Sequence, residues 1–154
     1  MLFLTACGGV SDAPDAPNPP DPDPVEPTVC EGDFEIDGRN DNTEQVIAEV
    51  TGCSVITGDL LIGGTSLEDL SFLANLTRVE GDLSIFDNSL TSLSGLEGIT
   101  SVGGSLSISG DLLTSLDALS GITGDLEGSL DIRGGSLTSL DGLEGIASVG
   151  GSLD

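Results

Sequence analysis

The chain has 154 residues, of which 27 are acidic and three are arginine, with no lysine and no histidine, so its formal net charge is −24. Such a charge repels phosphate backbones and excludes nucleic-acid binding through a basic surface. The lack of histidine excludes imidazole acid–base catalysis, a Ser-His-Asp triad and histidine metal ligands. The chain is nevertheless 37% hydrophobic, which is enough apolar content for one folded domain.

The first residues indicate export. Leu4, Thr5 and Ala6 precede Cys7, and this arrangement resembles the lipobox at the end of a bacterial lipoprotein signal peptide. The resemblance implies that residues 1–7 are the end of a signal peptide whose start lies upstream, and that Cys7 is lipidated. It also implies a lipid-anchored protein of the bacterial cell envelope, at the outer membrane or cell surface. The alternative is a chance apolar N-terminus with a free cysteine.

A disordered linker is predicted over residues 8–29. All seven prolines lie between residues 12 and 27, together with five carboxylates. Proline-rich chain is stiff, and like charges extend it further. We therefore expect the linker to hold a folded module away from the membrane.

Two cysteines, Cys30 and Cys53, remain after Cys7 is assigned to lipid. In an oxidising, exported compartment an isolated pair favours one disulfide. The alternatives are two free thiols or half of a metal site, although a zinc site would need two more Cys or His ligands. We expect the disulfide.

A repeated strand motif is the strongest feature of the chain. The run Ile56-Thr-Gly-Asp-Leu-Leu-Ile62 recurs from Val79, Val102 and Leu126, and a fifth copy begins at Val149, at spacings of 23, 23, 24 and 23 residues. Each copy alternates apolar and polar residues, which is the period of a strand with one buried face. A glycine at a fixed position is expected to allow positive φ or close packing at the corner leading into each strand. These repeat glycines are Gly58, Gly81, Gly104, Gly128 and Gly151.

A second apolar series follows each strand at a spacing of three residues. The second leucine of each series is followed by a helix-capping residue type, namely Ser71, Ser94, Asp117 or Asp141. Ser94 with Glu97, and Asp141 with Glu144, also have the spacing of a capping box. We therefore expect one short helical turn per repeat.

Stacking of the repeats follows from the same pattern. A single repeat cannot bury its leucines, whereas stacked repeats share a continuous aliphatic core and pair their strands. The sequence therefore predicts a β-solenoid with repeats of about 23 residues.

The first repeat carries a family resemblance. The run Cys30-Glu-Gly-Asp-Phe-Glu-Ile36, followed by Gly52-Cys53-Ser-Val-Ile-Thr-Gly-Asp-Leu-Leu-Ile62, resembles the start of receptor L domains. That family forms the ligand-binding lobes of the insulin and epidermal-growth-factor receptors and occurs in bacterial surface lipoproteins. The resemblance covers residues 30–154, which we expect to be incomplete at the C-terminus. It implies a short right-handed β-helix, related to leucine-rich-repeat superhelices, and it supports the Cys30–Cys53 pairing.

A short helix is predicted at the N-terminal end of this module. Residues 42–50 have Asn42 as a possible N-cap and place Val46, Ile47 and Val50 on one side. In the solenoid that the resemblance implies, this helix would cap the open N-terminal end.

Metal binding and catalysis are both disfavoured. Stacked carboxylates could hold Ca²⁺, and the candidates are Asp59, Asp82, Asp87, Asp111 and Asp125. However, the positions equivalent to Asp59 become serine in later repeats, as Ser105, Ser129 and Ser152, so a solvated acidic surface is favoured. No cleft with paired carboxylates is indicated, so we expect no catalytic residue, no metal and no cofactor.

A possible binding face is a hydroxyl ladder formed by Thr91, Thr114 and Thr138, with Phe86 as an aromatic at an outward or corner position. Aromatic residues are enriched at protein interfaces, so an exposed Phe86 favours a binding surface. Threonine, however, is also an ordinary solvent-facing residue of pleated surfaces. Our hypothesis is a non-enzymatic cell-surface lipoprotein whose solenoid binds an extracellular protein or glycan. The alternative is a purely structural, acidic spacer or coat protein with no specific ligand.

Overall fold

The structure is a computed structural model that describes residues 26–110 and 112–154. The expected signal-peptide end, Cys7 and most of the expected linker lie outside the described residues, as does Asp111. Val29, the last residue assigned to the linker, already belongs to a strand. Among the described residues, no helix is long and apolar enough to cross a lipid bilayer.

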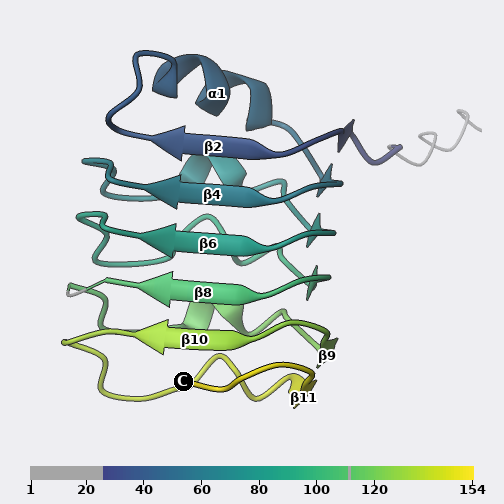
Figure 1. Cartoon of the computed structure of the whole chain (residues 1–154), viewed down its shortest axis with the longest axis vertical. Helices are drawn as coiled ribbons and strands as arrows, with labels where there is room; N and C mark the ends of the chain where they lie inside the picture. Colours follow the sequence, from purple (N-terminus) through teal and green to yellow (C-terminus); the bar gives the residue numbers. More distant parts are fainter. Residues whose placement is uncertain (1–25, 111) are drawn as a thin grey trace, which may run out of the picture.

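Parallel sheets organise the chain, and successive passes lie one above another (Figure 1). The largest sheet has the strand order β10-β8-β6-β4-β2. Its strands are β2 (Phe34–Asp37), β4 (Leu60–Gly63), β6 (Leu83–Phe86), β8 (Leu106–Ser109) and β10 (Leu130–Arg133).

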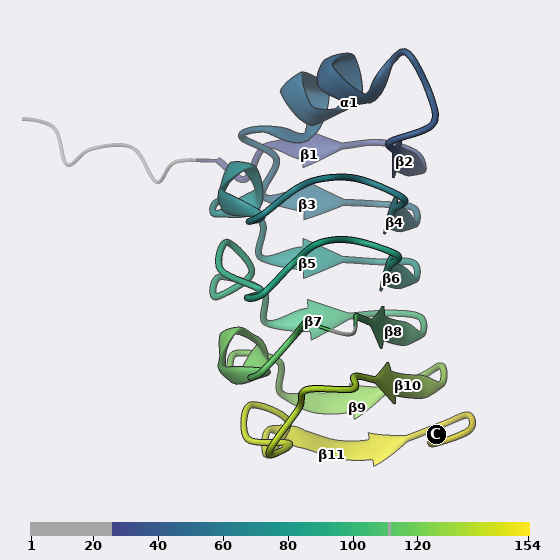
Figure 2. The ribbon, with the colours of Figure 1, turned by 90° about the vertical axis from the view of Figure 1, so that its left-hand side faces the viewer.

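A second sheet runs alongside the first, with the order β1-β3-β5-β7 (Figure 2). Its strands are β1 (Val29–Cys30), β3 (Val55–Ile56), β5 (Arg78–Val79) and β7 (Ser101–Val102). Below it, β9 (Gly124–Leu126) pairs with β11 (Ile146–Val149). All pairings between these strands are parallel, as stacking of the repeats predicts.

The register of the large sheet aligns equivalent residues of successive repeats. Leu60 pairs with Leu83, and Leu83 pairs with Leu106. Ile62 likewise pairs with Ile85 two positions later in the strand. Because side chains alternate along a strand, these leucines and isoleucines all point inward while the residues between them point outward.

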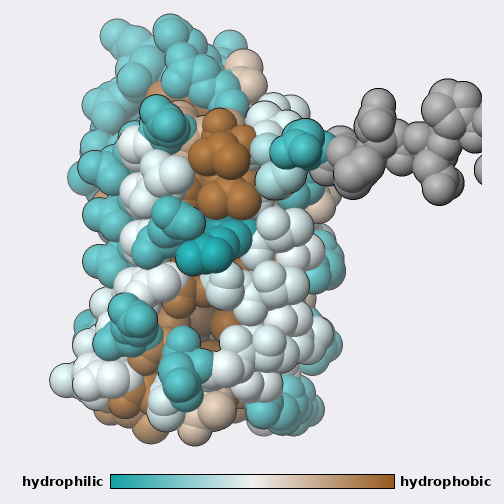
Figure 3. Space-filling view, turned by 90° about the vertical axis from the view of Figure 1, so that its right-hand side faces the viewer, coloured by the Kyte–Doolittle hydropathy of each residue, from teal (hydrophilic) through white to brown (hydrophobic). Residues whose placement is uncertain are grey.

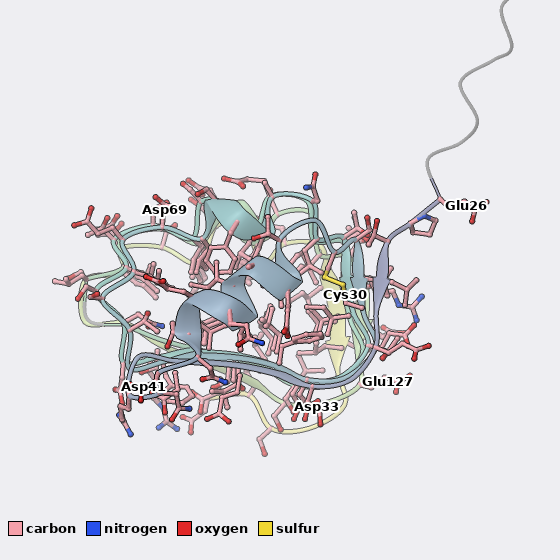
Figure 4. All side chains as sticks on the ribbon, turned by 90° about the horizontal axis from the view of Figure 1, so that it is seen from above. Glu26, Cys30, Asp33, Asp41, Asp69 and Glu127 are labelled. Carbon is pink, nitrogen blue, oxygen red and sulfur yellow. A yellow bond between two sulfur atoms is a disulfide. The ribbon has the colours of Figure 1, made fainter. Side chains whose placement is uncertain are left out.

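The core is a continuous aliphatic cluster, as the two apolar series predict. Seen down the stack, apolar side chains fill the interior while the labelled carboxylates of Asp33, Asp41, Asp69 and Glu127 lie around the outside (Figure 4). Leu70, Leu93 and Leu116 are at most 1% exposed, whereas their equivalent Leu140 is 61% exposed. Leu70, Leu93 and Leu116 are each followed by a later copy of the series, so a leucine of the series is buried where a later copy packs against it.

A helix, α1 (Thr43–Val50), lies beside β2 at the N-terminal end of the stack (Figure 1). Val50 is buried, and Val46 and Ile47 pack against the core, on one side of the helix as the sequence predicts. Asn42 is the N-cap residue, as predicted, but its side chain makes no capping hydrogen bond. Instead, the Thr43 hydroxyl donates to the carbonyl oxygens of Asp37 and Asn40, at 2.6 and 2.8 Å.

The expected helical turn in every repeat is wrong for half of the repeats. Short 3₁₀ helices occur at η1 (Ser71–Leu73) and η2 (Asp117–Leu119). The other two repeats have Gly95 and Gly142 after the capping position, at φ +109° and +102°. A Cβ atom there would clash with the carbonyl of the preceding repeat, so glycine makes a tight turn in place of the 3₁₀ helix.

The hydrogen bonds of these turns also differ from a capping box. In each repeat a side-chain oxygen accepts the N–H two residues further on, as Asp69 Oδ1 does from Ser71 at 2.9 Å. Ser92, Ser115 and Ser139 do the same in the later repeats. Glu97 accepts from the N–H of Gly95 at 2.7 Å, rather than from the residue three positions before it.

Candidate functional site

A column of side-chain hydrogen bonds runs along the corner that leads into the large sheet. The Asp33 carboxylate accepts from the N–H of Asp59 at 2.9 Å, and Asp59 accepts from Asp82 at 2.8 Å. Asp82 then accepts from Ser105 at 2.6 Å, and the Ser105 hydroxyl accepts from Ser129 at 3.1 Å. The Ser129 hydroxyl continues the series to Ser152. We call these residues the corner column.

The corner column explains the repeat glycines. None of the five has a positive φ, so that alternative is wrong. A Cβ atom on Gly81 would overlap Oδ1 of Asp59 and the backbone of Gly58, and Gly104 is in the same position relative to Asp82. The glycine is therefore needed because the side-chain oxygen of the preceding repeat fills the space of its Cβ.

The corner column also accounts for two of the carboxylates considered as Ca²⁺ ligands, Asp59 and Asp82. Asp59 and Asp82 each use one oxygen to accept a backbone N–H, and serine does the same where aspartate is replaced. The hydrogen bonds therefore continue through every repeat, whereas the carboxylates end at Asp82. Among the described residues, no group of three His, Cys, Asp or Glu residues is placed to hold a metal ion.

The disulfide between Cys30 and Cys53 is confirmed. Cys30 ends β1, and Cys53 is buried between α1 and β3. The bond therefore ties the first strand of the second sheet to the chain segment that enters the next strand.

The hydroxyl ladder is exposed but does not include Phe86. Thr91, Thr114 and Thr138 are exposed and lie in non-strand segments that follow the strands of the large sheet. Figure 2 shows such segments crossing in front of the second sheet. Phe86, by contrast, is the last residue of β6 and is half-buried. The serines beside the threonines are engaged in their own turns, as described above. The structure therefore separates the predicted face into two surfaces.

Phe86 belongs to the outward side of the large sheet. The register places Phe86 beside Gly63 of β4, and the Phe86 ring occupies the space that a Cβ on Gly63 would fill. An aromatic ring lying over a neighbouring glycine is a recognised way of stabilising a sheet. This contact leaves the Phe86 side chain half-buried.

A patch without charge surrounds Phe86. The outward positions of β4, β6 and β8 are uncharged, whereas those of β2 and β10 carry Glu35, Asp37, Asp131 and Arg133. We call the uncharged set the neutral patch; it consists of Leu61, Gly63, Ser84, Phe86, Ser107 and Ser109. Of these residues, only Phe86 was predicted from the sequence. Strand alternation identifies the other outward positions, and comparing their charges between repeats would have revealed the rest of the patch.

Carboxylates border the neutral patch on three sides. Glu35 and Asp37 lie on β2, Asp59 and Asp82 precede β4 and β6, and Asp87 follows β6. We call these five residues the acidic border. Arg39 reaches two of them, with guanidinium nitrogens 3.9 Å from Asp37 and 3.8 Å from Asp87, but its side chain is 70% exposed. One arginine against five carboxylates leaves the border with a net negative charge.

The second sheet offers a smaller apolar surface. Val29, Val55, Arg78 and Ser101 form one outward column in register. Figure 3 shows an apolar area near the upper end of this side, with hydrophilic atoms directly below it and further apolar atoms in the lower half. Val29 is 50% exposed and adjoins the N-terminal segment of the chain. This surface is interrupted by a charge after two residues, unlike the neutral patch.

The pKa of Asp69, away from both sheets, is lowered. Hydrogen bonds from the Ser71 hydroxyl and backbone N–H lower the pKa of Asp69, which is exposed at the start of η1. The shift reflects the turn described above and indicates no catalytic group.

Comparisons with known proteins agree with this architecture. The family model of the receptor L domain matches residues 28–90 and again residues 52–110. The overlapping matches include the disulfide, the repeated strands β1 to β8 and the whole neutral patch. No curated protein and no solved structure matches the chain. Since the family matches together span more than half of the 154 residues, the protein belongs to the receptor L domain family.

Proposed function

We propose that this protein is a non-enzymatic binding module of a cell-surface lipoprotein, and that the neutral patch is where it takes a protein partner. Receptor L domains are ligand-binding domains in receptors, which supports a binding role in general terms. The charges and contacts of the large sheet support this particular surface.

The observation that carries the proposal is the loss of charge at the centre of the large sheet. In a chain of net charge −24, three adjacent strands present six outward positions without a single charge. Interface centres are depleted in charged residues and enriched in aromatic ones, and their rims are polar. The neutral patch has this arrangement, with Phe86 and Leu61 half-buried inside the acidic border.

The proposal also includes the handedness of the fold and the cellular location of the protein. The stacked passes wind as a right-handed solenoid, with α1 covering its N-terminal end. Cys7 carries lipid in the bacterial cell envelope, and the segment between Cys7 and β1 is the linker from which the folded module is displayed outside the cell. The apolar and small residues before Cys7 and the proline-rich acidic segment support this arrangement.

Differential capture from extracellular extracts tests the binding surface. The wild-type chain, a Leu61→Ser/Phe86→Ser variant and a Val29→Ser variant are immobilised in equal amounts, after circular dichroism shows that all three are folded. We expect at least one protein to be retained by the wild type and by Val29→Ser, but not by the double variant. Val29→Ser is the matched control because it removes an exposed apolar side chain from the other sheet.

The same experiment separates the alternatives. If nothing is retained by the wild type, the spacer or coat function is favoured and the binding proposal fails. If the retained material is a glycan, or if the double variant retains the same protein as the wild type, the protein-binding role of the neutral patch is wrong.

The anchor is tested separately. Cells expressing the full gene product are labelled with an alkyne analogue of palmitate, for the wild type and for Cys7→Ser. We expect label and membrane association in the wild type and neither in the variant. Label on both proteins, or on neither, would exclude Cys7 as the lipidated residue.

A further inference from the structure

The partner's own charge can be inferred from the surroundings of the neutral patch. We infer that the partner is a basic protein segment, in which an apolar or aromatic side chain meets Phe86 and Leu61 while lysine or arginine side chains meet the acidic border. This inference rests on the proposed function, because it names the chemistry of the partner at that same surface.

The centre of the surface selects for an apolar contact. The Phe86 ring lies over Gly63, so its position is fixed by a close contact within the sheet. Leu61 and Ser84 are neighbours in the outward column beside it, and both are half-buried. A partner side chain that covers these residues removes apolar area from water without having to desolvate a charge, which favours association.

The surroundings select for positive charge. The acidic border contributes five carboxylates around the patch, and Arg39 is the one cation that approaches them among the described residues. Asp59 and Asp82 each accept one backbone N–H through Oδ1, and both side chains are exposed to a partner. An acidic or phosphorylated partner would meet like charge on three sides, at a cost in affinity.

Selection from a peptide library tests this inference. A phage library of random 12-residue peptides is selected against the full chain at low salt, with subtraction against the Leu61→Ser/Phe86→Ser variant. We expect the surviving peptides to be enriched in lysine and arginine on both sides of an aliphatic or aromatic residue. Binding of synthetic copies should weaken steeply as salt is raised, because exposed charges are screened.

A matched pair of charge variants locates the electrostatic contribution. Glu35→Gln/Asp37→Asn removes two carboxylates of the acidic border, and Glu68→Gln/Glu127→Gln removes two exposed carboxylates outside the large sheet. We expect the border variant to bind the selected peptide roughly tenfold more weakly than the wild type, at about threefold per carboxylate. The control variant, which has the same net charge, should bind like the wild type.

The outcomes distinguish this inference from the proposed function. Peptides that depend on Phe86 and Leu61 but are neutral or acidic, or that bind the border and control variants equally, overturn the basic partner while leaving the binding surface in place. If no selected peptide loses binding in the Leu61→Ser/Phe86→Ser variant, both the partner chemistry and the surface are wrong.

Discussion

The Asp59 carboxylate accepts a hydrogen bond at 2.8 Å from the backbone N–H of Asp82, the equivalent residue 23 positions later. The Gly81 N–H beside it donates to the carbonyl of Gly58 at 3.1 Å. At this corner each repeat is therefore joined to the next by a side-chain hydrogen bond in addition to backbone hydrogen bonds. Serine replaces aspartate further along without loss of the side-chain bond.

Replacing Asp59 tests whether the hydrogen bond or the charge matters. Asp59→Ala removes the acceptor for the Asp82 N–H, and we expect it to lower the free energy of unfolding by about 1 kcal/mol. Asp59→Ser should cost less, because Ser105 and Ser129 act as acceptors at equivalent positions. Urea unfolding and hydrogen exchange of the Asp82 amide measure both effects. The Ser129 amide, which is bonded elsewhere, should exchange equally in all three proteins, and equal exchange of the Asp82 amide would contradict the prediction.

Adding a methyl group at Gly81 should destabilise the stack. The new Cβ would overlap Oδ1 of Asp59 and the backbone of Gly58, so the repeats would have to move apart. We expect Gly81→Ala to lower the free energy of unfolding by about 1–3 kcal/mol.

Gly110→Ala is the matched control for this substitution. A Cβ atom on Gly110 would lie 3.2 Å from Cδ1 of Leu113, which is the end of a side chain and not backbone. We therefore expect Gly110→Ala to change the free energy of unfolding by less than about 1 kcal/mol. Denaturant titrations of the two variants and the wild type give the comparison. If both alanines have the same effect, close packing does not explain the fixed glycine.

The strands and their stacking could be predicted because they follow from local patterns. Alternation of Leu83 and Ile85 with polar residues sets a strand, and repetition of that pattern sets the parallel register. The disulfide followed from counting cysteines. These features depend on residue type at fixed spacing, which a sequence displays directly.

The corner column and the neutral patch could not be predicted from local sequence patterns. The hydrogen bond from the Asp82 N–H to the Asp59 carboxylate joins two repeats that are distant in the sequence. Because serine replaces aspartate at Ser105, the sequence does not show that the same bond recurs in later repeats. The 3₁₀ helices were overpredicted because Gly95 and Gly142 permit a backbone conformation that removes the helical turn. The neutral patch is defined by missing charge at neighbouring strands, which emerges only when the register is known.

Removing the disulfide should weaken the N-terminal end. The bond closes a loop between residues separated by 23 positions, which is worth about 3 kcal/mol in the chain-entropy model. We expect the reduced wild type to unfold at a lower urea concentration than the oxidised protein. A Cys30→Ser/Cys53→Ser variant should unfold at a low concentration with or without reductant. A reductant effect of the same size in this variant would show that the loss does not arise from the disulfide.

The turn at Asp69 should give a small loss of stability in acid. Hydrogen bonds from the Ser71 hydroxyl and N–H hold the pKa of Asp69 below its ordinary value. A lowered folded-state pKa means that the stabilisation is fully present above the pKa of the unfolded chain and is lost as pH falls through the folded-state pKa. Asp69→Ser should keep the bond to the Ser71 N–H, as Ser92 does in the next repeat, and remove this dependence on pH.

Titration of the Asp69 carboxyl carbon by nuclear magnetic resonance tests the cause of the shift. Ser71→Ala removes the hydroxyl donor, which is the largest cause, and keeps the backbone donor. We therefore expect the pKa of Asp69 to rise toward its ordinary value in this variant without reaching it. Ser66→Ala, an exposed serine of the same segment, should leave the titration of Asp69 unchanged. Identical titrations of Asp69 in the wild type and in Ser71→Ala would show that the turn hydrogen bonds do not set its pKa.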